Sequence, residues 1–270
     1  GRAGNPTLWI YYENGQPLRS EETGTLAGAA NRKTFYKDGK VSRVEEDTNG
    51  DGKPDSFSYF EAGQLVRKDL DRKYVGKVDL WGHYENGRLV RQDEDVHGEG
   101  KVSRVLYFSG DEVVRREEDT ARRGRMDLVE VFGSGQLKQR LRDTQGAGRW
   151  DTLYSYKDNQ LVREERDTNG DGYFDLRILY ENGVTVAQEA DTNGDRRADV
   201  WVKFDKGERV EQLEDMNYQG KVTARYIFKA GAVAQQEQIE NGEPPWSSEP
   251  FANVEQTVQK TASFTSIGTR

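Results

Sequence analysis

The stretch DTNGDGYFDLRILYENGVTVAQEAD, residues 167–191, contains one complete unit of an internal repeat and the start of the next. Asp167 and Asp191 are 24 residues apart, and further steps of 24 lead to other aspartates: Asp47, Asp71, Asp95, Asp119, Asp143 and Asp215. In the same register an aromatic residue recurs at ten positions: Tyr12, Tyr36, Phe60, Tyr84, Phe108, Phe132, Tyr156, Tyr180, Phe204 and Phe228. Ten aromatic positions at one period do not follow from composition, so the chain is a tandem array.

Each unit is predicted to be a β-hairpin. Two extended runs flank a two-residue turn such as Asn86-Gly87 or Asn182-Gly183. Asn-Gly between extended runs indicates a type I′ turn, because this turn needs positive φ at both central residues. A two-residue turn also fixes the register and predicts aromatic–aliphatic cross-strand pairs. These pairs are Tyr36 with Val41, Phe60 with Leu65, Tyr84 with Leu89, and Tyr156 with Leu161.

The expected fold is therefore all-β, with tandem 24-residue hairpins forming a continuous antiparallel, superhelical sheet. A five-bladed β-propeller with two hairpins per blade is the alternative. It would require a period of 48 with alternating loops, and the intact loops that begin at 47, 167 and 191 do not alternate in that way. Residues 1–8 are interpreted as a lead-in, 9–238 as the ten-copy array, and 239–270 as a linker and C-terminal tail.

Composition limits the class of protein. The 270 residues carry 48 acidic and 40 basic side chains, a net charge of −8, so nucleic acid is not an expected partner. No apolar run is long enough to span a bilayer, and no signal peptide is visible. A start at Gly1 suggests a processed N-terminus, with room for a lipid anchor upstream. The chain has no cysteine, which excludes disulfides and thiolate metal sites.

The loops between hairpins contain the residues that predict metal chemistry. In DTNGDGKPD, residues 47–55, side-chain oxygens stand at loop positions 1, 3, 5 and 9, and Gly52 at position 6 permits a tight bend. Calcium prefers six to eight hard oxygen ligands, to which a backbone carbonyl can contribute. The predicted ligands of this loop are Asp47, Asn49, Asp51, Asp55 and the carbonyl of Lys53. The loop at 167–175 repeats the pattern with Asp167, Asn169, Asp171, Asp175 and the carbonyl of Tyr173.

A third calcium loop is expected at 191–199, although Arg196 replaces the glycine at position 6. Its predicted ligands are Asp191, Asn193, Asp195, Asp199 and the carbonyl of Arg197. The remaining loops, here called the eroded loops, keep the first aspartate and lose the middle oxygens. They are expected to hold their turns without metal. The alternative for all loops is a set of Asx-rich turns that bind no metal.

These motifs resemble known repeat families. The Asp loops are similar to the D-x-N/D-x-D-G-x-x-D calcium loops of integrin-type and FG-GAP β-propeller repeats, which also join two strands. The stretches WIYYENGQPLR (9–19), WGHYENGRLVR (81–91) and ILYENG (178–183) resemble the bacterial variant of MORN repeats and, more loosely, the YD repeats of RHS-type shells. The MORN resemblance implies an extended sheet that acts as a scaffold or binding surface.

Two charged columns accompany the hairpins. Arginines at 19, 43, 67, 91, 115 and 163 are each followed two residues later by a carboxylate. Residues i and i+2 share a strand face, so ion pairs between neighbouring hairpins are expected, with a ligand-binding groove as the alternative. In the tail, Phe251, Val254 and Val258 have helical spacing and predict a short segment that caps the last hairpin or docks on a partner.

Catalysis finds little support in the sequence. The two histidines, His83 and His97, lie beside the aromatic column and in an eroded loop, and no nucleophile, zinc or phosphate motif is present. The expected function is a non-enzymatic, calcium-stabilised binding or scaffold protein that recognises a protein or a cell-surface glycan. It is expected in the bacterial periplasm, on the outer-membrane surface as a lipoprotein, or secreted, because weak calcium sites fill there. The alternatives are a carbohydrate-binding or polysaccharide-active protein and an antitoxin or immunity-type protein.

Overall fold

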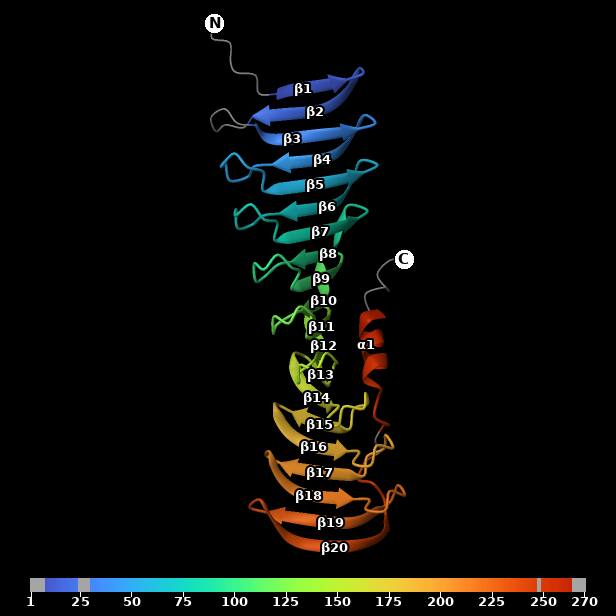
Figure 1. The fold of residues 1–270 in the computed structure, drawn as a ribbon. Helices are drawn as coiled ribbons and strands as arrows, with labels where there is room; N and C mark the ends of the chain where they lie inside the picture. Colours follow the sequence, from blue (N-terminus) through green and yellow to red (C-terminus); the bar gives the residue numbers. More distant parts are fainter. Residues whose placement is uncertain (1–7, 24–29, 247–248, 264–270) are drawn as a thin grey trace. The chain divides into compact units, whose positions relative to one another are not determined.

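The computed structural model describes residues 8–23, 30–246 and 249–263 and is built almost entirely of β-strands (Figure 1). The chain divides into two compact units, Gly1–Met126 and Asp127–Arg270. Most of the expected lead-in and of the loop between 23 and 31 lies outside the described residues.

The first unit contains ten antiparallel strands in five successive hairpins. They are β1 (Leu8–Glu13), β2 (Gln16–Thr23), β3 (Ala30–Lys37), β4 (Lys40–Glu46), β5 (Ser56–Glu61), β6 (Gln64–Leu70), β7 (Leu80–Glu85), β8 (Arg88–Glu94), β9 (Arg104–Ser109) and β10 (Glu112–Glu118).

The second unit repeats this arrangement and adds the only helix of the described residues. Its elements are β11 (Leu128–Gly133), β12 (Gln136–Arg142), β13 (Thr152–Lys157), β14 (Gln160–Arg166), β15 (Leu176–Glu181), β16 (Val184–Ala190), β17 (Val200–Asp205), β18 (Glu208–Glu214), β19 (Val222–Lys229), β20 (Ala232–Gly242) and α1 (Val254–Ser263).

The hairpin turns have the geometry that the sequence predicts. In every hairpin turn except Gly110-Asp111 both central residues take positive φ, for example 50° at Asn86 and 77° at Gly87. The predicted cross-strand pairs are confirmed: Tyr36 lies opposite Val41, Phe60 opposite Leu65, Tyr84 opposite Leu89, and Tyr156 opposite Leu161. The second strand of the hairpin contains one residue more than its partner strand, which the sequence analysis did not predict. Val90 has no partner, because the register moves from Tyr84–Leu89 to His83–Arg91, which is a β-bulge.

The propeller alternative is wrong. Blades of two hairpins would break the hydrogen-bonded ladder after every fourth strand. In the first unit β4 pairs with β5 and β8 with β9, and in the second β12 pairs with β13 and β16 with β17. Each unit is therefore an open sheet of consecutive hairpins, as the main prediction states.

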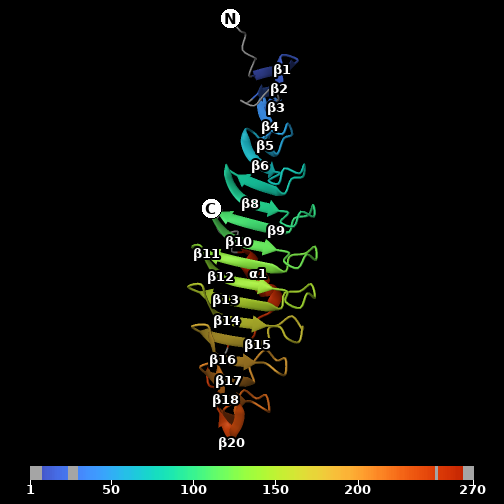
Figure 2. The ribbon, with the colours of Figure 1, turned by 90° about the vertical axis from the view of Figure 1, so that its left-hand side faces the viewer.

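Backbone hydrogen bonds also join consecutive Asp loops at the end of the strands opposite the turns. The N–H of the first aspartate donates to the carbonyl at position 9 of the preceding loop, as from Asp191 to Asp175 at 2.9 Å. The same bond runs from Asp71 to Asp55 at 2.8 Å. The loops of the second unit consequently project in one series from its sheet (Figure 2). Their spacing therefore follows that of the hairpins.

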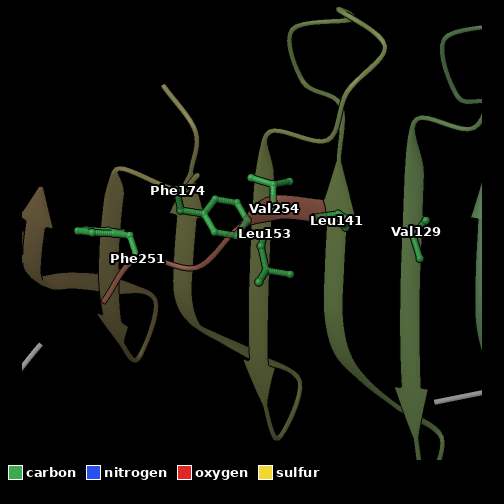
Figure 3. Packing of buried hydrophobic residues seen from close by; sticks show 6 residues of the cluster. All are labelled: Val129, Leu141, Leu153, Phe174, Phe251 and Val254. Atoms are coloured by element: carbon green, nitrogen blue, oxygen red, sulfur yellow. The ribbon is translucent and has the colours of Figure 1, made fainter. Parts of the chain in front are cut away.

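The C-terminal tail forms the expected short helix but does not cap the last hairpin. It returns to the middle of the second unit, where Phe251 and Val254 pack with Leu153 and Phe174 (Figure 3). Val129 and Leu141 complete this buried cluster. The backbone fixes the position, because the N–H of Val254 donates to the carbonyl of Gly172 at 2.9 Å. The tail therefore covers one face of the second sheet instead of its edge.

Candidate functional site

The first aspartate of each Asp loop accepts hydrogen bonds from the loop backbone. In loop 47–55, Asp47 Oδ1 accepts the N–H of Gly50 at 2.6 Å, and its Oδ2 accepts the N–H of Gly52 at 2.7 Å. Asn49 Oδ1 accepts the N–H of Asp51 at 2.9 Å. These bonds form a series of Asx turns, which explains how the short loop keeps its shape.

The ninth loop residue closes the loop from the side of the sheet. Asp55 is 5 % exposed, and its carboxylate accepts the Thr48 hydroxyl at 2.6 Å and the Thr48 N–H at 2.9 Å. Asp175 holds Thr168 in the same manner, at 2.7 Å from the hydroxyl. Of the predicted ligands in the first loop, Asn49 and Asp51 stay exposed at the tip, whereas Asp55 faces the sheet.

The eroded loops use their first aspartate in the same way. The N–H of Gly76 donates to Asp71 at 2.6 Å, and the N–H of Gly100 donates to Asp95 at 2.6 Å. Burial raises the pKa of Asp71, but the hydrogen bonds from Val75, Gly76 and Lys77 outweigh it and hold this pKa below its ordinary value. The recurrence of aspartate at loop position 1 therefore has a structural cause that needs no metal.

The metal prediction consequently depends on loop positions 3 and 5. Among the described residues, no group of three or more His, Cys, Asp or Glu side chains is arranged to hold a metal ion. In the full loops the exposed donors are one amide and one carboxylate, Asn49 with Asp51 and Asn169 with Asp171. Each oxygen of Asp47 accepts one N–H and has a second lone pair, so the donor set is compatible with calcium if the loop rearranges slightly.

The loop at 191–199 keeps the same bend although it lacks the glycine. Arg196 takes φ 73°, and its N–H donates to Asp191 Oδ2 at 2.7 Å. The Arg196 guanidinium lies over the Tyr173 ring, 4.0 Å from the centroid, which offsets the backbone strain. Burial raises the pKa of Asp199; hydrogen bonds from Thr192 only partly offset this, and the charge of Asp191 adds to the increase.

A second candidate site is the sheet face that bears the arginines of the first unit, here called the arginine face. Its arginine row alternates arginine with a ring on successive strands. Cross-strand pairs connect Tyr11, Arg19, Phe35, Arg43, Tyr59, Arg67, His83, Arg91, Tyr107 and Arg115 in this order. Beside it runs the acidic row, which contains Trp9, Glu21, Lys33, Glu45, Phe57, Asp69, Trp81, Asp93, Val105 and Glu117.

The ion pairs of the arginine face form within single strands. Arg67 Nε donates to Asp69 Oδ1 at 2.6 Å, and its Nη2 donates to Oδ2 at 2.8 Å. Arg91 Nε donates to Asp93 Oδ1 at 2.7 Å, and this bond raises the pKa of Arg91 above its ordinary value despite some burial. The predicted pairs between neighbouring hairpins are not the rule on this face, since each of its arginines uses the carboxylate two residues later.

Pairing between hairpins occurs in the second unit. Arg177 on β15 contacts Glu165 on β14 at 3.2 Å and Glu189 on β16, and its side chain is only 6 % exposed. The tail lies over this group: the Phe251 ring is 4.8 Å from the Arg177 guanidinium, and Trp246 Nε1 donates to Glu189 Oε2 at 2.9 Å. The sequence analysis missed Arg177 and Trp246, because their roles depend on where the tail returns.

The histidines have structural contacts. His83 stands in the arginine row with Nε2 3.2 Å from Asp93 Oδ2, and His97 Nε2 lies 3.3 Å from the carbonyl of Asp119. Both contacts use a ring nitrogen, Nε2 in each case.

Comparisons with known proteins add little to this geometry. No protein-family model matches the chain, and no curated protein matches it. Among solved structures, the chain is similar to a crystal structure of accessory secretory proteins 1, 2 and 3 of Streptococcus pneumoniae, with 18% identity and a TM-score of 0.25. That match covers 48% of this chain and 20% of the other. No helix in the described part of the chain is long and apolar enough to cross a membrane.

Proposed function

We propose that this protein is a non-catalytic binding scaffold and that the arginine face of the first unit is its binding surface. Among the described residues of that unit, the ion pairs and ring contacts of the arginine row are made within the two rows themselves. Part of the corresponding face of the second unit is occupied by Phe251, Val254 and Val258 of the tail. This difference is the observation that carries the proposal.

The two candidate sites share a property that suits binding better than catalysis. The carboxylates of the arginine face are engaged by arginines, and the aspartates of the loops are engaged by backbone N–H groups. Such groups position a ligand or stabilise a turn. General acid–base catalysis instead requires a group whose pKa lies near the working pH. A binding role uses what these side chains still offer, namely exposed guanidinium groups and half-buried rings.

An affinity experiment tests the proposal. The purified chain is immobilised and exposed to fractions of bacterial envelopes and culture medium. A control column holds a variant in which the pairs Arg67–Asp69 and Arg91–Asp93 are both changed to Gln–Asn. The proposal expects a component that the native chain retains and the variant does not. Equal retention by both columns, or none by either, would contradict it.

We further propose that calcium stabilises the two full loops, 47–55 and 167–175, and to a smaller extent the loop at 191–199. Asp47, Asn49, Asp51 and Asp55, with the carbonyl of Lys53, would supply the ligands in the first loop. The support is the placement of four oxygen-bearing side chains within nine residues, two of them exposed at the tip. Calcium at 100 times its Kd would add about 2.7 kcal/mol per site.

Thermal unfolding with and without a chelator tests the calcium proposal. Chelation should lower Tm, and millimolar calcium should restore it, whereas magnesium should be less effective because it loses its water reluctantly. An unchanged Tm would contradict the calcium proposal and favour the alternative, in which the loops are Asx turns that bind no metal. Location at the cell envelope or outside the cell is proposed on the same basis, since calcium sites of modest affinity are filled there.

A further inference from the structure

The arginine face exposes its positive groups and buries its negative ones. The Arg67 side chain is 46% exposed and that of Asp69 is 6% exposed. Arg91 and Asp93 show the same asymmetry, at 46% and 11%. A ligand that approaches this face therefore meets guanidinium groups, although the numbers of arginines and carboxylates are equal.

The exposed arginines recur at a constant interval. Arg19, Arg43, Arg67 and Arg91 lie on every second strand, on β2, β4, β6 and β8. Strands in a sheet are about 4.8 Å apart, so consecutive arginines are about 9.6 Å apart. Arg115 ends the series, because its side chain is only 10% exposed.

The rings hold these arginines in position. The Arg67 guanidinium lies 5.6 Å from the centroid of Tyr59, and that of Arg91 lies 5.8 Å from the centroid of Tyr107. Arg19 lies closer to Tyr11, at 4.4 Å. A guanidinium held by a carboxylate at one edge and by a ring at its face loses less conformational entropy when it binds a ligand.

Each guanidinium still has N–H groups to donate. Arg67 uses Nε and Nη2 for Asp69, and among the described residues its Nη1 has no acceptor. Arg91 uses Nε for Asp93. The remaining N–H groups can form charge-assisted hydrogen bonds with a carboxylate or sulfate.

We propose that the arginine face binds a linear acidic polysaccharide that carries one carboxylate or sulfate per disaccharide. A regular polymer repeats its charge along its length, and one disaccharide has about the length of two strand spacings. One anionic group can therefore meet each of the four arginines, while the half-buried ring edges between them contact sugar C–H groups. This inference rests on the proposed binding function and specifies its ligand.

The second unit does not offer such a series. Its positions that correspond to the arginines are Gln139, Arg163, Ala187, Glu211 and Gln235. Only one of the five is basic. The acidic polymer is thus expected on the first unit alone, which gives the test an internal reference.

The test uses hyaluronan oligosaccharides, which carry one carboxylate per disaccharide, with dextran as neutral polymer and poly-L-glutamate as acidic peptide. The binding variant is R67Q/D69N/R91Q/D93N, which removes two complete ion pairs and leaves the net charge unchanged. The control variant is R32Q/K68Q, which removes two positive charges from alternate strand positions of the same unit. Calorimetry measures binding, and circular dichroism confirms that each variant is folded.

The native chain and R32Q/K68Q should bind hyaluronan alike and dextran not at all. The quadruple variant should bind hyaluronan at least about tenfold more weakly, because two of the four exposed arginines can no longer form charge-assisted hydrogen bonds with the polymer. Equal affinity of the variant, or the absence of hyaluronan binding, would overturn the inference. Binding of poly-L-glutamate alone would also overturn it in favour of an acidic protein, and would leave the proposed binding function intact.

Discussion

The two units share one hairpin repeat but differ in a single pair of rows on one face. In the first unit, the strand position two residues after the arginine is acidic in all five hairpins: Glu21, Glu45, Asp69, Asp93 and Glu117. In the second unit, the corresponding residues are Leu141, Glu165, Glu189, Leu213 and Glu237. Where Leu141 meets Val129 and Leu153, the face becomes apolar and binds the tail. The replacement of the carboxylate by Leu141 thus accompanies the apolar part of the face on which the tail packs.

The largest expected effect that tests this comparison is at Arg177. Changing Arg177 to Ala leaves the buried Glu165 and Glu189 without their shared partner, and breaking a buried ion pair costs about 3–5 kcal/mol. The matched change Arg67→Ala affects a half-exposed arginine and should cost about 1 kcal/mol. Hydrogen exchange with mass spectrometry, which reports each unit separately, should show loss of protection around β14–β16 for the first variant. Equal effects at both arginines would contradict the difference between the units.

A somewhat smaller effect is expected from the tail. Phe251 is 3% exposed, and Phe251→Ala should reduce the free energy of tail docking by about 3 kcal/mol. The helix VEQTVQKTAS is short, and among its described side chains it buries Val254 and part of Val258, so it should lose its order once the anchor is removed. The exposed Glu255→Ala is the control. Faster exchange in α1 with unchanged exchange in β5–β8 would agree with this prediction, whereas slow exchange in α1 would refute it.

The sequence predicted the hairpins and their register because turn chemistry is local. Asn86-Gly87 determines the turn, and a two-residue turn determines which side chains lie opposite each other. The bulge at Val90 was not predictable, since valine fits a regular strand position equally well. The docking site of the tail was not predicted either. A signal was present: Leu141 replaces the carboxylate that most other repeats carry at this position, and an apolar interruption of a charged row indicates a covered surface.

The loop prediction from the sequence was limited in a different way. Asp, Asn and Gly at these spacings favour both an Asx turn and a calcium site, because the same oxygens can accept N–H groups or bind a cation. In the structure, Asp47 of a full loop and Asp71 of an eroded loop both accept the N–H of the glycine at loop position 6. Only Asn49, Asp51 and their counterparts distinguish the two kinds of loop.

The next prediction separates these interpretations and compares the units. In the native loops the N–H of Lys53 donates to Asp51 Oδ1 and that of Tyr173 to Asp171 Oδ1, both at 2.8 Å. Asp51→Asn and Asp171→Asn keep an oxygen that can accept these hydrogen bonds. Neither change should alter Tm in chelator. In calcium at 100 times Kd, each should remove up to about 2.7 kcal/mol of stabilisation, confined to its own unit. Loss of stability in chelator would instead show that the carboxylate is needed for the turn.

The smallest expected effect concerns Tyr180 in the second unit. Its hydroxyl donates to Glu164 Oε2 at 2.8 Å, and burial, this hydrogen bond and the charge of Glu164 raise the pKa of Tyr180 to about 12 from an ordinary value of 10.0. Because the folded form keeps the proton longer than the unfolded form, the contribution to stability is fully present below pH 10 and is lost as the pH rises through about 12. Tyr180→Phe should therefore flatten the decline of the unfolding free energy between these values. The control Tyr84→Phe, in the same aromatic column of the first unit, leaves Tyr180 in place and should keep the native slope. Urea unfolding at several pH values with tyrosinate absorbance measures both, and an unchanged slope in Tyr180→Phe would show that the Glu164 contact does not restrain this proton.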